Sequence, residues 1–233
     1  MFRELGGHDM KTAIAAGWAF AFVACGGAFA GEHTHDCATL LAGTSLRDFV
    51  LMRVTATDRV HFADCEAATC KVEAYVVPGD QLIAASGAGD LACTVFPNKR
   101  GGTKGWIPSG FLSPARTQSN PPPAAWAGKW QLHKDAEIDI RVEGSELAVK
   151  GQAFWMSGAP GVIHDGELTG KNKPEGDTLA LPKPEDYDKL ESADNPEYTC
   201  AATLRLLGPY LVVRDNLHCG GLNVTFTGAY RRL

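Results

Sequence analysis

The sequence lacks an excess of positive charge. Its 233 residues include 22 Lys and Arg against 27 Asp and Glu, which gives a formal net charge of −5. A protein that binds nucleic acid or an anionic membrane surface by electrostatic attraction needs a basic field. We therefore expect no nucleic-acid partner and no attraction to an anionic membrane.

The sequence also lacks a long apolar run beyond its first thirty residues, so we do not expect a transmembrane protein. It contains no GxSxG elbow, no HExxH pair, no phosphate-binding loop and no dinucleotide fingerprint. These absences favour a protein that binds over one that catalyses. A cell-wall hydrolase or accessory enzyme remains an alternative, because carboxylates can pair in space without a local motif.

The one apolar run predicts a signal peptide over residues 1–30. Met10 and Lys11 precede the run TAIAAGWAFAFVA, and residues 28–30 form a small-residue cleavage site. Cleavage there would remove Arg3, Lys11, Glu4 and Asp9, so the net charge would stay at −5. We expect a periplasmic or secreted bacterial protein.

Cys25 offers an alternative to simple cleavage. It follows FVA and could be the lipid-modified cysteine of a lipoprotein, although the usual leucine of that motif is missing. In the simpler interpretation Cys25 is discarded with the signal peptide.

An even number of cysteines remains after cleavage, which predicts three disulfides in an exported chain. The simplest arrangement pairs Cys65 with Cys70 and Cys37 with Cys93, although the other two pairings of these four stay open. The six residues are Cys37, Cys65, Cys70, Cys93, Cys200 and Cys219.

The C-terminal segment predicts a β-hairpin. Apolar residues alternate along residues 202–206, and Gly208 with Pro209 suits a two-residue turn in which glycine takes a positive φ. Counting outward from this turn places Leu206 opposite Leu211 and Leu204 opposite Val213 on one face.

The same register places Arg205 and Arg214 together on the other face, which we expect to be wet. It also brings Cys200 close to Cys219, so we predict a disulfide between them. A reactive Cys219 is the alternative. Alternation from Leu222 to Tyr230 predicts a third strand.

The first half of the mature chain has the short apolar runs of a small β-barrel, after a short helix expected within residues 38–49. YVVPGD at residues 75–80, a strand ending at Phe96, and GWI at residues 105–107 together resemble a bacterial SH3-like domain over residues 51–113. The resemblance implies a binding module. The run from Arg59 to Phe62 departs from the family pattern, which puts the usual ligand groove in doubt.

Tyr75 and Trp106 are candidate ligand-binding residues of this domain. Aromatic side chains also dominate burial in small domains, so barrel core is the competing interpretation for Tyr75, Phe96, Trp106 and Phe111.

Residues 31–114 are therefore expected to form the SH3-like domain with an N-terminal extension, and the proline-rich residues 115–125 an extended linker. Residues 126–233 contain about eight short apolar runs, among them residues 136–142, 147–151 and 178–181, which suits an antiparallel β-barrel. The predicted fold class is all-β, with an SH3-like barrel followed by a second antiparallel barrel.

Two further resemblances concern this second domain. Gly128 and Trp130, together with Arg231 or Arg232 near the end, are similar to the calycin barrels, which implies an arginine stacked on the tryptophan. The ending DNxxCGGxNVxFxGxY at residues 215–230 resembles exported lysozyme-inhibitor-like proteins.

Phe154, Trp155 and Met156 are candidate ligand-binding residues of the second domain. Three consecutive apolar side chains cannot share one face of a strand, so at least one should point outward or line the barrel mouth. Core packing at a bend is the competing interpretation.

The mature N-terminus is a candidate metal site. Gly31, Glu32 and His33 would present an amine, two amides and an imidazole, the four nitrogens that suit Cu(II) or Ni(II). An accidental histidine in an N-terminal tail is the alternative. We predict no other cofactor.

These observations predict an exported, non-enzymatic binding protein of the cell envelope, whose ligand is a cell-wall glycan, another envelope component or a protein. A second hypothesis is an inhibitor of a lysozyme-like hydrolase. In it, the acidic insert at residues 183–197 would steer the protein toward a basic enzyme.

Overall fold

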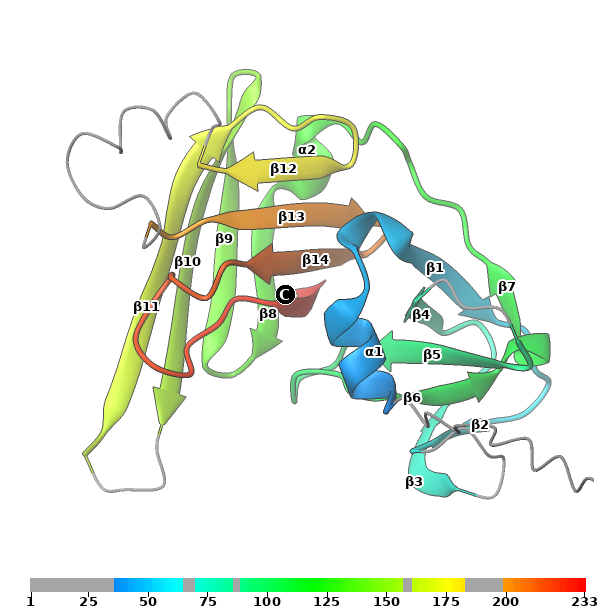
Figure 1. The fold of residues 1–233 in the computed structure, drawn as a ribbon. Helices are drawn as coiled ribbons and strands as arrows, with labels where there is room; N and C mark the ends of the chain where they lie inside the picture. The colour runs from blue at the N-terminus through cyan, green and yellow to red at the C-terminus, as the bar shows by residue number, and fades with distance from the viewer. Residues whose placement is uncertain (1–35, 65–69, 86–88, 157–160, 183–198) are drawn as a thin grey trace, which may run out of the picture. The chain divides into compact units, whose positions relative to one another are not determined.

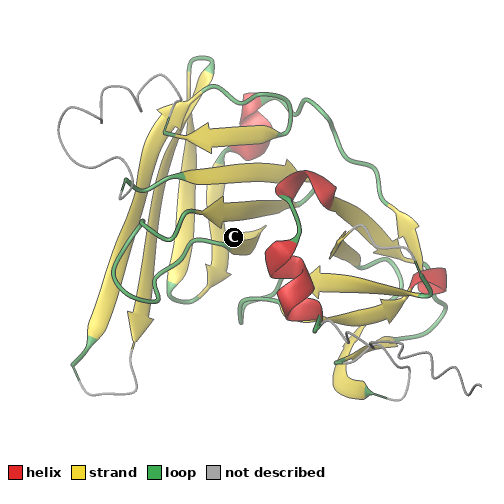
Figure 2. Cartoon of the chain, viewed as in Figure 1, coloured by secondary structure: helices red, strands yellow, loops and turns green. Residues whose placement is uncertain are grey.

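A computed structural model describes residues 36–64, 70–85, 89–156, 161–182 and 199–233 (Figure 1). These residues lie within one compact unit. Strands dominate it and the helices are short (Figure 2), so the predicted all-β class is confirmed. No helix in the described ranges is long and apolar enough to cross a membrane.

The first half of the chain forms a seven-stranded antiparallel sheet in the order β3-β2-β6-β5-β4-β1-β7, here called sheet A. Its strands are β1 Phe49–Val54, β2 Val60–Ala63, β3 Lys71–Val76, β4 Gln81–Ala85, β5 Leu91–Phe96, β6 Thr103–Pro108 and β7 Leu112–Pro114, with the 3₁₀ turn η2 Ser109–Phe111 before β7.

Two short helical elements precede sheet A where one helix was expected. Helix α1 spans Cys37–Gly43, and the 3₁₀ turn η1 spans Leu46–Asp48. Asp36 caps α1 by accepting from the backbone N–H groups of Ala38 and Thr39, each at 3.3 Å. Helix α1 ends at Gly43, where Thr44 takes an extended conformation and its backbone N–H donates to the Leu40 carbonyl oxygen.

The second half forms an eight-stranded antiparallel sheet, sheet B, in the order β11-β10-β9-β8-β15-β14-β13-β12, which curls into a nearly closed barrel. Its strands are β8 Gly128–His133, β9 Ala136–Glu143, β10 Glu146–Met156, β11 Ile163–Asn172, β12 Thr178–Leu181, β13 Ala202–Leu207, β14 Tyr210–Asp215 and β15 Gly228–Arg232.

The segment before sheet B is not extended throughout. The helical turn α2, Pro123–Trp126, occupies the end of the predicted linker, with a proline at its first position. Proline fits there because its missing N–H would have no partner in the helix.

The predicted hairpin is confirmed in register. Leu206 pairs with Leu211 and Leu204 with Val213, and Gly208 has a φ of 62° at the turn. The disulfide between Cys200 and Cys219 is present, with 4.4 Å between the Cα atoms. The bond between Cys37 and Cys93 is also present, whereas Cys65 lies outside the described residues.

The expectation of a strand from Leu222 to Tyr230 is wrong for its first half, because β15 begins only at Gly228. Residues 220–227 instead form a looped segment held by the buried carboxylate of Asp215. Thr225 Oγ1 donates to Asp215 Oδ1 at 2.8 Å, and the Phe226 backbone N–H donates to Oδ2 at 3.1 Å. Thr227 Oγ1 also donates to Oδ1.

The face of β13 and β14 expected to be wet is covered instead. Arg205 Nη1 donates to the carbonyl oxygens of Leu46 at 2.7 Å and Phe49 at 2.8 Å, and its Nε donates to Asp177 at 2.8 Å. Val212 on this face packs in one core cluster with residues of α1 and sheet A. The outer face of the barrel therefore forms a second buried layer.

The barrel interior is filled by a separate core that includes Trp130, Phe226 and Tyr230, all fully buried. Arg232 closes one end: its Cζ lies 4.2 Å from the centroid of the Trp130 ring. This is the arginine–tryptophan contact that the calycin resemblance implied, and it selects Arg232 over Arg231.

Candidate functional site

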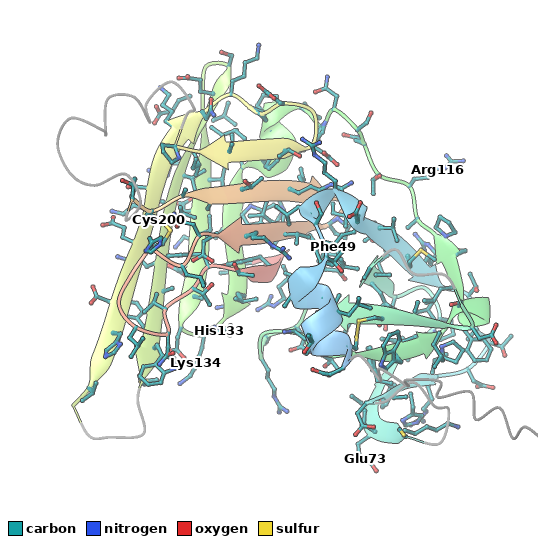
Figure 3. The ribbon with its side chains drawn as sticks, viewed as in Figure 1. Phe49, Glu73, Arg116, His133, Lys134 and Cys200 are labelled. Atoms are coloured by element: carbon teal, nitrogen blue, oxygen red, sulfur yellow. A yellow bond between two sulfur atoms is a disulfide. The ribbon has the colours of Figure 1, made fainter. Side chains whose placement is uncertain are left out.

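An apolar cavity of about 300 Å³ lies beside α1, where the helix, sheet A and the outer face of the barrel meet. We call it the α1 cavity. Helix α1 contributes Ala38, Leu41 and Ala42, whose spacing of three and four residues places them on one helical face. Ile83 of sheet A and Val212 of the barrel are among the other apolar lining residues. Two labelled residues of the lining, Phe49 and His133, can be found in Figure 3.

The walls of the α1 cavity are fixed from two sides. The disulfide from Cys37 ties the first residue of α1 to Cys93 on β5. On the other side, Thr225 and Thr227 line the cavity while their hydroxyls donate to Asp215. The site is therefore preformed, which reduces the ordering cost of binding.

The polar part of the lining is cationic. Lys104 on β6 is exposed, and Arg214 on β14 is half-buried with its Nη2 donating to the Leu41 carbonyl oxygen at 3.4 Å. His133 Nδ1 accepts from the Asp135 backbone N–H at 3.2 Å. None of the described residues that line the cavity is an Asp or a Glu.

None of the five aromatic and apolar candidates from the sequence lines this cavity. On β10, Trp155 is half-buried against the barrel core and its ring lies 5.3 Å from that of His164. Phe154 and Met156 point to the opposite face and are 44% and 52% exposed. The expectation that at least one of the three points outward is confirmed.

Exposed apolar surface continues across the strand pair, because Met156 pairs with Ile163, which is 60% exposed. Directly opposed residues of an antiparallel pair share a face. Phe154, Met156 and Ile163 therefore form one apolar patch, here called the hairpin patch.

The two candidates from the first half of the chain, Tyr75 and Trp106, separate into one surface and one core residue. Tyr75 is 46% exposed, and the Arg59 guanidinium carbon lies 4.8 Å from its ring centroid. Trp106 is buried in the cluster beside α1. The core interpretation holds for Trp106 but is wrong for Tyr75, and also for Phe111, which is 44% exposed.

The candidate metal ligands Gly31, Glu32 and His33 lie outside the described residues, as does the acidic insert. Within the described ranges, no group of three or more His, Cys, Asp or Glu side chains is placed to hold a metal ion.

The chain matches no family model, no curated protein and no solved structure.

Sequence reasoning missed the α1 cavity because its residues come from segments far apart in the chain. Two signals in the sequence bear on it. One is the apolar spacing of Ala38, Leu41 and Ala42, and the other is the placement of Arg205 and Arg214 on one face of the hairpin. Neither signal shows that the helix and that face meet.

Proposed function

We propose that the chain is an exported, non-enzymatic binding protein of the bacterial cell envelope that holds a small, largely apolar molecule in the α1 cavity. The observation that carries the proposal is the cavity itself, which is concave, preformed and lined mainly by apolar side chains. Its volume of about 300 Å³ lies at the lower end of the range of roughly 300–1,000 Å³ for small-ligand sites.

Export is supported by the sequence and by chemistry. Residues 1–30 have the organisation of a cleaved signal peptide, and the disulfides Cys37–Cys93 and Cys200–Cys219 persist in oxidising compartments. The Cys37–Cys93 bond fixes a wall of the proposed site, so site formation and export are linked.

Titration of the purified, disulfide-bonded chain with decanol tests the proposal. We expect saturable binding by calorimetry and a rise in the unfolding temperature, because a ligand that binds only the native state stabilises it. Ala38→Phe should abolish both effects, since the larger side chain would occupy the cavity from α1. The cavity is not a binding site if decanol does not bind measurably. The same holds if decanol binds wild type and Ala38→Phe equally well.

A second candidate function is inhibition of a lysozyme-like hydrolase, and the hairpin patch is the observation that favours it. Exposed apolar side chains grouped on one strand pair mark protein-binding surfaces. The net charge of −5 suits a basic enzyme.

Retention of lysozyme on the immobilised chain, compared with retention of cell-wall fragments, tests this second function. Phe154→Ser should weaken lysozyme retention, whereas Phe111→Ser, which changes an equally exposed phenylalanine outside the patch, should not. Retention of cell-wall fragments alone would reject the inhibitor and support a glycan ligand.

A further inference from the structure

We propose that the ligand of the α1 cavity is a single-chain amphiphile with an anionic headgroup, whose acyl chain lies against α1 and whose headgroup is bound by Lys104 and Arg214. This inference rests on the proposed binding function and specifies the chemical class of ligand. A free fatty acid and a monoacyl phosphate share the required chemistry.

The charge of the lining is the first argument. The chain as a whole is acidic, with a formal net charge of −5, yet the charged side chains that line the α1 cavity are the two cations Lys104 and Arg214. A cationic site on an acidic protein favours an anionic group over a neutral or cationic one.

The absence of carboxylate partners for these two cations, among the described residues, is the second argument. Among the described residues, neither Lys104 nor Arg214 has a carboxylate within ion-pair distance. By contrast, Arg205 on the same barrel face is paired with Asp177 at 2.8 Å. The cations at the cavity are therefore available to a ligand, while a neighbouring cation is used for structure.

Two carboxylates among the described residues, Asp36 and Asp215, are bonded to residues of the lining, and neither forms an ion pair with these cations. Asp36 accepts from the backbone N–H groups of Ala38 and Thr39 at the start of α1. Asp215 is buried and accepts hydrogen bonds from Thr225 Oγ1, Thr227 Oγ1 and the Phe226 backbone N–H. Its charge is therefore satisfied within the looped segment. The anionic headgroup then belongs at Lys104 and Arg214 rather than at the threonines.

The apolar part of the lining is the third argument. Leu41, Phe49, Ile83, Val95, Leu132 and Val212 are buried residues of three different structural layers that meet at the cavity. Such a surface binds hydrocarbon, with a gain of about fourfold in affinity per buried methylene. The side chains of Trp130, Phe226 and Tyr230, which fill the barrel interior, do not line this site.

Binding of matched ligands to the disulfide-bonded chain tests the inference. Decanoate, decyl phosphate, decanol and decyltrimethylammonium carry the same hydrocarbon with different headgroups, and calorimetry below the micelle concentration gives their dissociation constants. We expect the two anions to bind about three- to tenfold more tightly than decanol. The cation should bind most weakly, and only the anions should lose affinity as salt is added. The ratio between decanoate and decyl phosphate identifies a carboxylate or a phosphate headgroup.

Variants locate the headgroup. Lys104→Gln and Arg214→Gln should each remove most of the preference for decanoate over decanol and leave decanol binding unchanged. Lys150→Gln is the matched control, because Lys150 is an exposed lysine on β10 that does not line the cavity.

The possible failures are distinct. If decanol and decanoate bind equally and both are lost in Ala38→Phe, the cavity is a neutral apolar site: the headgroup assignment is overturned and the proposed function survives. An anion preference that persists in Lys104→Gln and Arg214→Gln also overturns the assignment. If no decyl compound binds, the inference and the proposed function both fail.

Discussion

Arg232 shows how one side chain can close the end of a barrel. Its guanidinium lies over the Trp130 ring, with 4.2 Å from Cζ to the ring centroid, and its Nη2 donates to the Ala125 carbonyl oxygen at 2.6 Å. Its Nη1 donates to the Ala127 carbonyl oxygen. Gly128 has a φ of 127°, and a Cβ there would lie 2.9 Å from Arg232 Nη1. Glycine is therefore required beside the arginine.

Replacing Arg232 with alanine should lower the free energy of unfolding by about 1–3 kcal/mol, through loss of the cation–π contact and of the hydrogen bonds to two carbonyl oxygens. Urea unfolding monitored by tryptophan fluorescence measures the change. Arg141→Ala is the control: its ion pair with Asp139 is mostly exposed and should contribute less than about 0.5 kcal/mol. Equal losses in the two variants would contradict a structural role for the contact.

Asp215 is a second residue whose single side chain stabilises a whole segment of the chain. Its carboxylate accepts from two threonine hydroxyls and one backbone N–H. Asp215→Asn removes the charge and one acceptor oxygen, so we expect a loss of about 1.5–3 kcal/mol. Asp139→Asn on β9 is the control: Asp139 is half-buried and its partner Arg141 is mostly exposed, so we expect a loss of less than about 0.5 kcal/mol in the same unfolding measurement. If Asp215→Asn leaves the free energy of unfolding unchanged, the looped segment is held by its apolar residues instead.

At the scale of the element, backbone hydrogen bonds join β11 to Cys219 and to the start of the looped segment. The Glu167 N–H donates to the Cys219 carbonyl oxygen at 3.0 Å, and the Gly221 N–H donates to the Asp165 carbonyl oxygen at 3.0 Å. Gly166 and Gly220 meet between these bonds. A Cβ on Gly166 would lie 2.4 Å from the Cys219 carbonyl oxygen, so no larger residue fits without displacing the backbone.

Gly166→Ala should therefore lower the free energy of unfolding by about 1–3 kcal/mol, the usual cost of overpacking. Gly110→Ala is a matched control, because a Cβ on Gly110 meets no atom within 4 Å and no positive φ opposes the change. Hydrogen exchange at the Gly221 amide reports the contact directly and should accelerate only in Gly166→Ala. If both variants unfold alike, the close approach of the two glycines is unimportant.

The elements that the sequence predicted correctly are those with local signals. β13 and β14 were placed in register because apolar residues alternate on both sides of a Gly–Pro turn, and β9 and β10 showed the same alternation. No separate strand was named over residues 163–172, which form β11, because glycine weakens a strand pattern. The fold explains its glycines, because other segments approach β11 so closely at Gly166 and Gly170 that a Cβ would collide with them.

The wrong predictions concern residues whose structure depends on partners distant in the sequence. Alternation at residues 222–226 predicted a strand, but the Asp215 carboxylate satisfies groups that a neighbouring strand would otherwise satisfy. The core interpretation of Tyr75 rested on its size, yet Tyr75 lies on the surface with Arg59 over its ring. In both cases the deciding partner lies at least ten residues away, where periodicity gives no information.

At the scale of the whole compact unit, sheet A and sheet B are joined by hydrogen bonds from the outer face of the barrel. Besides Arg205, Tyr210 donates its hydroxyl proton to the Gln81 carbonyl oxygen at 2.9 Å. Burial, with a smaller contribution from Asp80, raises the pKa of Tyr210 to about 12. Burial also raises the pKa of Tyr230, whose hydroxyl donates to the Phe226 carbonyl oxygen at 2.9 Å.

A raised tyrosine pKa makes stability depend on alkaline pH. Since the native state keeps the proton more firmly than the unfolded chain, this stability is fully present below about pH 10, the unfolded pKa. It is lost as the pH rises through the native value of about 12 for Tyr210. We expect the urea midpoint to fall between about pH 9 and about pH 11.

Tyr210→Phe should reduce that fall, because phenylalanine has no proton to lose, while costing about 0.5–1.5 kcal/mol at neutral pH for the lost hydrogen bond. Tyr75→Phe is the control, since the Tyr75 side chain is exposed. An identical alkaline fall in wild type and Tyr210→Phe would assign the effect to other groups.

The pairing of residues 219–221 with β11 also bears on self-association. An uncovered strand edge is a template for another chain, and here the looped segment occupies that edge. Cys219 keeps the segment in place through its bond to Cys200. Reduction of this bond would let the segment leave, so that the edge of β11 beside the apolar hairpin patch becomes open to intermolecular pairing. We therefore expect the chain to associate more readily once the Cys200–Cys219 bond is reduced, which light scattering of the oxidised and the reduced chain would measure.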